Sequence, residues 1–169
     1  MRYFSGRIIL IAVVFSSCRY GAKDESAKKE KTNPKIRNGI VVTSKNINVE
    51  EAYLAFDDST RIPEDNKVKV NQKVWLQLVT SGWKLKDSTA FLSGRETVET
   101  DDGIMLLDNK DLFKDFDNGL SGGSSQTIGI SIMITELRKQ HDYFKVSFKI
   151  KDEIEPRNAV EGYYKLRPY

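Results

Sequence analysis

The sequence predicts an all-β fold, a two-sheet antiparallel sandwich with one short helix. Three observations support this fold class. Apolar and polar residues alternate along several short segments, a pattern typical of strands that bury one face and expose the other. Turn-forming residues separate these segments at intervals of roughly eight to fifteen residues, as in sandwiches and barrels. The region that shows the alternation, residues 38–169, is long enough for one domain with a single core.

The first expected strand covers residues 47–56. Its apolar phase slips at Glu50-Glu51, which indicates a β-bulge. The next clear strand covers residues 74–79 and carries apolar side chains on both faces, so we expect it to be covered on both sides. The sequence Asp-Asp-Gly at residues 101–103 is a strong hairpin signal. Weaker alternation predicts shorter strands at residues 67–70, 89–92, 96–99 and 104–107.

A short helix is expected between the hairpin and the following strand. Within residues 108–116, Asp111 is a suitable N-cap residue. Leu112, Phe113 and Phe116 follow at spacings that place them on one helix face. We therefore expect this helix to pack over one end of the sandwich.

The C-terminal part of the chain alternates most regularly. Isoleucine occupies every second position over residues 128–134, and apolar residues do the same over residues 144–150. Because residues 135–142 link these two strands directly, we expect them to form an antiparallel pair. The last strand, residues 160–166, ends close to Pro168, which cannot donate a hydrogen bond to a β-ladder.

Many short strands with regular turns resemble the immunoglobulin-like type of sandwich. The resemblance concerns architecture alone, because the paired cysteines of antibody domains are missing and Cys18 is the only cysteine in the chain. A C2-like sandwich and a small closed barrel remain alternatives. With one cysteine the chain cannot form an intramolecular disulfide, so packing has to supply its stability.

The N-terminal residues have the pattern of a bacterial secretion signal. Residues 8–15 are all apolar, two arginines precede them, and Ser16-Ser17-Cys18 follows. The segment from residue 14 to Cys18 resembles the lipobox of bacterial lipoproteins, with phenylalanine where leucine is usual and Ser17 where glycine or alanine is usual. The resemblance implies that residues 1–17 are a signal peptide and that Cys18 receives fatty acyl chains. Several such chains hold a protein stably at a membrane.

Other interpretations of this segment are ordinary secretion, a buried strand and an uncleaved membrane anchor. The apolar run of residues 8–15 falls well short of the roughly 20 residues needed to span a bilayer. A buried strand at this position would have no partner next to it in the sequence. The lipoprotein interpretation is therefore preferred.

Residues 18–37 are expected to form a disordered tether, because their composition offers too little apolar area to offset the entropy of ordering. Residues 19–37 carry seven basic and three acidic residues, whereas residues 38–169 carry 18 basic and 21 acidic residues. The expected sandwich domain is thus slightly acidic, which argues against a nucleic-acid partner. The cluster Lys23-Asp24-Glu25 is similar to surface-export signals of some lipoproteins and leaves periplasmic and surface placement both open.

The sequence predicts no catalytic site, cofactor or metal centre. His141 is the only histidine, it lies in a polar link expected to be exposed, and no motif supplies a serine or cysteine nucleophile beside it. One histidine and one lipidated cysteine also exclude the usual zinc sites. Acidic loops could supply calcium ligands, but an EF-hand register around Gly119 fails because Lys114 and Phe116 fall on ligand positions.

Aromatic residues are the remaining functional signal. Trp83 follows a turn glycine, and Trp75 is out of phase with the leucines of its strand. Tyr163 is likewise out of phase with Tyr164. When exposed, such rings stack on sugars or anchor protein partners, and otherwise they pack the core.

We therefore expect a non-catalytic binding module of the bacterial cell envelope, anchored by its lipid to the outer membrane on the periplasmic or surface face. Its partner would be an envelope protein or a glycan. The alternative is an accessory or structural subunit of an envelope adhesion, secretion or glycan-uptake assembly.

Overall fold

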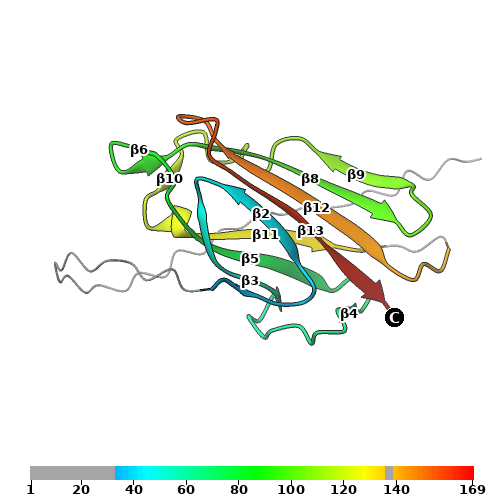
Figure 1. Cartoon of the computed structure of the whole chain (residues 1–169). Coiled ribbons are helices and arrows are strands. Elements are labelled where there is room, and N and C mark those ends of the chain that lie inside the picture. The colour runs from blue at the N-terminus through cyan, green and yellow to red at the C-terminus, as the bar shows by residue number, and fades with distance from the viewer. Residues whose placement is uncertain (1–32, 136–138) are drawn as a thin grey trace, which may run out of the picture.

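Two β-sheets pack face to face in a computed structural model that describes residues 33–135 and 139–169. The strands β3, β5 and β11 form one layer and β8, β12 and β13 the other, as Figure 1 shows. The first sheet has the strand order β1 (Lys35–Ile36), β3 (Asn48–Phe56), β5 (Lys73–Ser81) and β11 (Thr127–Met133).

The second sheet is the larger one. Its order is β2 (Val41–Lys45), β13 (Ala159–Pro168), β12 (Phe144–Asp152), β8 (Leu92–Thr100) and β9 (Met105–Asn109). The short strand β4 (Lys67–Val68) lies parallel to the end of β13. A small third sheet joins β10 (Leu120–Ser121), β7 (Thr89–Ala90) and β6 (Leu85–Lys86) at one end of the molecule.

The predicted all-β antiparallel sandwich is confirmed, with two short parallel pairings, β1 with β3 and β4 with β13, as its exceptions. The core lies between the two sheets and is filled by alternating residues of both, including Leu76 and Leu78 on β5, Ile130 on β11, and Val146 and Ile150 on β12. Burial of such side chains contributes roughly 1.5–3 kcal/mol each. In the described part of the chain, no helix is long and apolar enough to cross a membrane.

Three local predictions are confirmed. The β3–β5 register shifts between Val49 and Glu51, so the phase slip in the sequence marks a real irregularity. The Asp-Asp-Gly turn connects β8 and β9, where Gly103 adopts a positive φ of 82° that suits glycine. Trp75 is 5% exposed, so β5 is covered on both faces as expected.

The prediction of a short helix within residues 108–116 is wrong. The segment forms turns instead, although the Asp111 carboxylate does accept a hydrogen bond from the Phe113 backbone at 3.2 Å. The Leu112 backbone donates to the Gly94 carbonyl at 2.9 Å, which ties the chain to β8 before a helical turn can follow. The Leu112 and Phe113 side chains then cover Gly94, where an added β-carbon would lie 2.8 Å from the Phe113 ring. The apolar residues that predicted a helix are thus placed over Gly94 by turns. Among the described residues, the helical segment is the 3₁₀ helix Ser124–Gln126.

Two further expectations are corrected. The strands at residues 128–134 and 144–150 do not pair with each other, because β11 pairs with β5 and β12 pairs with β8 and β13, so their link crosses between the sheets. The sandwich also begins before residue 38, since Lys35–Ile36 pairs with β3 inside the range expected for the tether. The expected signal segment and the tether up to residue 32 lie outside the described residues.

Glu96 places a carboxyl group at an inward position of the second sheet. Glu96 on β8 is fully buried, and neither of its oxygens has a hydrogen-bond partner within the described residues. The Tyr164 hydroxyl on β13 is buried and unpartnered in the same way. Burial raises the pKa of Glu96 to about 8, and burial together with the neighbouring Glu96 raises the pKa of Tyr164 well above its usual value. Glu96 is therefore mostly protonated and neutral at pH 7.

Candidate functional site

A polar groove with a volume of about 350 Å³ lies beside the end of β13. Three segments far apart in the sequence form it: the turn that leads into β2, the loop before β4, and the outward face of β13. Its lining residues are Asn38, Gly39, Val41, Glu64, Asp65, Asn66, Tyr163, Lys165 and Arg167. Most of them carry hydrogen-bonding or charged groups, so the groove suits a polar ligand.

The groove is held in shape by two buried asparagines. The Asn38 side-chain nitrogen donates to the Asn66 side-chain oxygen at 2.9 Å and to the Ile62 carbonyl at 3.0 Å. Asn66 in turn donates to the carbonyls of Asn38 at 2.8 Å and of Lys165 at 2.9 Å. The Asn38 side-chain oxygen accepts from the Leu54 backbone at 2.9 Å. Both asparagines have a left-handed backbone, which asparagine tolerates better than most residues.

This network ties the groove loops to both sheets, because Leu54 belongs to β3 and Lys165 to β13. Each amide is satisfied in the interior, where an unpaired polar group would cost about 1–3 kcal/mol. The groove is therefore preorganised rather than formed by mobile side chains, which lowers the entropic cost of binding.

The β13 wall of the groove carries an exposed aromatic ring. Tyr163 is 36% exposed, and Lys165 and Arg167 follow it on the same outward face of β13. Val41 on β2 lies directly opposite Tyr163 in the β2–β13 register and is 44% exposed. The two side chains place a small apolar surface inside an otherwise polar groove.

The groove holds charges of both signs that are not paired across it. The Glu64 carboxylate accepts a hydrogen bond from the Asn38 backbone at 2.7 Å, and the Asp65 carboxylate lies 3.5 Å from the Lys67 ammonium outside the groove lining. Within the described residues, neither Lys165 nor Arg167 forms an ion pair with a carboxylate. The Lys165 ammonium does lie 3.8 Å from the centroid of the Tyr143 ring, but neither cation has an anionic partner there.

The structure separates the three aromatic residues that the sequence pointed to. Tyr163 lines the groove, whereas Trp83 is 7% exposed and belongs to the core, with its indole nitrogen donating to the Thr80 hydroxyl at 2.9 Å. Gly82, just before it, has a positive φ of 105°, and the Trp83 side chain belongs to the hydrophobic core cluster. Trp83 is therefore not exposed as a ligand-binding role would need.

Trp75 is also covered. Its indole nitrogen donates to the Asp57 carboxylate at 2.9 Å, and the Lys73 ammonium lies 4.5 Å from the ring centroid. These contacts seal the outer face of the first sheet at this position. Trp75 accordingly offers no open face for a sugar or a protein, and Cys18, the expected lipidation site, lies outside the described residues.

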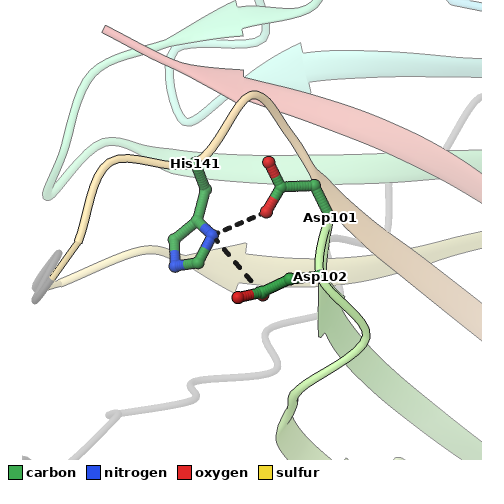
Figure 2. A group of neighbouring side chains, drawn as sticks. All are labelled: Asp101, Asp102 and His141. Carbon is green, nitrogen blue, oxygen red and sulfur yellow. Dashed lines mark hydrogen bonds and ion pairs between the residues drawn. The ribbon is translucent and has the colours of Figure 1, made fainter.

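A second polar cluster joins His141 to the β8–β9 turn, as Figure 2 shows. The His141 Nδ1 atom lies 2.7 Å from the Asp101 carboxylate and 3.8 Å from that of Asp102. The expectation of an exposed histidine is wrong, since its side chain is 10% exposed. The sequence offered no signal for this contact, because His141 and Asp101 are 40 positions apart and meet only when the loops fold together.

The carboxylates of this cluster are already satisfied by protein donors. Asp101 accepts from the Asp142 backbone at 2.8 Å and from His141, and these bonds lower its pKa in that order of importance. A hydrogen bond from the Thr100 hydroxyl, followed by one from Lys139, lowers the pKa of Asp102 to about 2.

Three atoms, from His141, Asp101 and Asp102, lie within 4.8 Å of one another and are of the types that ligate metals. The Lys139 ammonium, 2.9 Å from Asp102, already neutralises that carboxylate. The geometry therefore describes a clamp that holds the β8–β9 turn against the loop before β12.

Comparisons with known proteins show the fold of the chain. No protein-family model matches it, and no curated protein does. Among solved structures, the chain is similar to the crystal structure of the C-terminal domain of Wzt, with a TM-score of 0.52 and 11% sequence identity over 81% of this chain and 82% of that chain. At this identity the likeness concerns the fold alone.

Proposed function

We propose that the protein is a non-catalytic binding module of the bacterial cell envelope, and that the groove beside β13 binds a glycan. The observation that carries the proposal is the exposed Tyr163 ring in a preorganised groove rich in amide, carboxylate and cationic groups. Sugars have apolar C–H faces and a dense array of hydroxyls. An aromatic ring can stack on the C–H face, and the polar side chains beside it can hydrogen-bond the hydroxyls.

The polar groups of the groove match the hydrogen bonding of hydroxyls. A sugar hydroxyl both donates and accepts, so it can bridge a carboxylate and a cation. Glu64 supplies an acceptor on one wall, and Lys165 and Arg167 supply donors on the other. The volume of about 350 Å³ lies within the range of small-ligand sites.

The envelope placement is supported by the N-terminal pattern that ends at Cys18. Acyl chains on this cysteine would hold the sandwich beside a bilayer on a tether of about 15 residues. A flexible tether of that length reaches roughly 20 Å on average. The groove could then sample glycans near the membrane surface.

A glycan array tests the binding proposal. The full chain in detergent should bind one or more immobilised envelope oligosaccharides, and Tyr163→Ala should reduce binding about tenfold or more. Tyr53→Ala is the matched control, because Tyr53 lies on the other sheet, stacks under the Arg61 guanidinium at 4.3 Å and does not line the groove. Absence of binding to every glycan, or equal binding by the Tyr163 variant, would contradict the proposal.

The anchor is tested separately. Cys18→Ala should abolish labelling by radioactive palmitate and should move the protein from the detergent phase to the aqueous phase. An unmodified N-terminus on the wild-type protein, read by mass spectrometry, would contradict lipidation.

A role as an accessory subunit of an envelope assembly is the second candidate. It is favoured by an exposed apolar run at the edge of the second sheet, where Ile104, Met105 and Leu106 are 57%, 47% and 44% exposed. Edge strands with apolar side chains pair readily with other chains. Met105→Lys should then abolish crosslinks to a membrane partner without affecting glycan binding.

A further inference from the structure

Two lysines face each other across the strands next to the groove. Lys145 on β12 lies directly opposite Lys165 on β13, and both point to the outer face of the sheet. Like charges at directly opposed positions of a sheet are destabilising. Four residues along β12, Lys149 lies opposite Glu161 and forms an ion pair with it, so the same two strands also show the favourable arrangement.

Aromatic rings hold these two lysines in place. The Lys145 ammonium lies 5.4 Å from the centroid of the Tyr163 ring, and the Lys165 ammonium lies 3.8 Å from that of Tyr143. Lys145 has a carboxylate partner in Glu99 at 3.7 Å, whereas Lys165 has none among the described residues. Arg167 follows on the same face of β13 and is also without a carboxylate partner there. The β13 side of the groove is therefore a strip of positive charge beside an exposed ring.

We propose that the groove selects a saccharide that carries a carboxylate, such as a uronic acid, and that Lys165 and Arg167 bind this carboxylate. The inference rests on the proposed glycan-binding function and specifies its ligand class. The guanidinium of Arg167 matches a carboxylate with two parallel hydrogen bonds, and Lys165 adds a point charge beside it. A bound anion would also offset the repulsion between the opposed lysines.

The opposite wall of the groove fixes the orientation of such a ligand. Glu64 and Asp65 repel the carboxylate and accept hydrogen bonds from ring hydroxyls. The acidic group of the sugar then lies toward β13, and its hydroxyls lie toward the loop before β4. The same two carboxylates disfavour binding to a flat anionic membrane surface. Such a surface would contact the lysines and these carboxylates together, and the carboxylates would repel it.

Matched pairs of oligosaccharides test the selection. Tetrasaccharides of galacturonate, alginate and hyaluronan are titrated into the full chain in detergent by calorimetry, each beside its carboxyl-reduced form. The acidic member of at least one pair should bind tenfold or more tightly than its reduced form. Lys165→Ala and Arg167→Ala should each lower that preference severalfold, and Lys149→Ala, the control on the same face, should leave it unchanged.

The outcomes separate the two proposals. Equal binding of acidic and reduced forms, with loss of both in Tyr163→Ala, would overturn the carboxylate selection and keep the glycan site. Failure of every saccharide, acidic or reduced, on this panel and on the glycan array would overturn both. Binding to phosphatidylglycerol vesicles that depends on Lys165 and Arg167, with no saccharide binding, would assign the strip to a membrane surface instead.

Discussion

Replacement of Glu96 by glutamine should remove most of the dependence of stability on pH between pH 5 and 8. Glu96 has a pKa of about 8 in the folded protein, against an ordinary value of 4.5. The folded state therefore holds this proton to a higher pH than the unfolded state. Its contribution to stability is complete below about pH 4.5 and is lost as pH rises through 8.

The size of the effect follows from the shift in pKa. One pKa unit corresponds to about 1.4 kcal/mol, so the rise from 4.5 to about 8 corresponds to a loss on the order of 5 kcal/mol. Glutamine has nearly the same shape and does not titrate. The variant and the wild type should accordingly have similar stability near pH 4.5, and the variant should be several kcal/mol more stable above pH 8.

Urea unfolding at a series of pH values measures this difference, with the buried Trp75 and Trp83 as fluorescent probes. The other ionisable groups are present in both proteins, so their contributions cancel in the difference. Tyr164→Phe is the control, because it removes the neighbouring buried hydroxyl and keeps the carboxyl group. Parallel stability curves for wild type and Glu96→Gln from pH 5 to 8.5 would refute the assignment of a neutral buried carboxyl.

Three further predictions concern the core, the groove and the clamp. Trp83→Ala should lower the free energy of unfolding by about 3–5 kcal/mol in urea, because it opens a large cavity in the core; a loss below 1 kcal/mol would contradict the buried position. Asn66→Ala and Asn66→Gly should both lower it by about 2–3 kcal/mol through unpaired amide and carbonyl groups, and a loss confined to alanine would assign the effect to backbone strain instead. Asp101→Ala should speed hydrogen exchange at the Asp142 amide, because the Asp101 carboxylate accepts a hydrogen bond from that amide at 2.8 Å. An unchanged exchange rate would show that the clamp does not hold that loop.

Periodicity predicted the strands well, because each long strand buries one face against the other sheet. The bulge near Glu50 and the Asp-Asp-Gly turn were visible in the same way, since both leave a local mark on the alternation or the turn composition. The pairing of β11 and β12 was not visible. A short link between two strands indicates a hairpin, but here it crosses from one sheet to the other, a choice that depends on long-range contacts.

The candidate groove was predictable only in part. The phase of Tyr163 against Tyr164 marked an outward ring on the last strand, and the structure places that ring in the groove. The same phase signal failed for Trp75, because Lys73 on its own strand and Asp57 in the turn after β3 cover it. The Asn38–Asn66 pair left no signal, since its partners are 28 positions apart and asparagine in a loop usually indicates a turn.

An amide chemical-shift titration shows directly which residues contact a bound glycan. A glycan that the array identifies is added to the isotopically labelled full chain in detergent, and the shifted backbone amides are mapped onto the fold. If the groove binds the glycan, the largest shifts should fall on Asn38, Gly39, Asn66 and Tyr163. Shifts confined to the β9 edge, or none at saturating glycan, would show that the groove is not the glycan site.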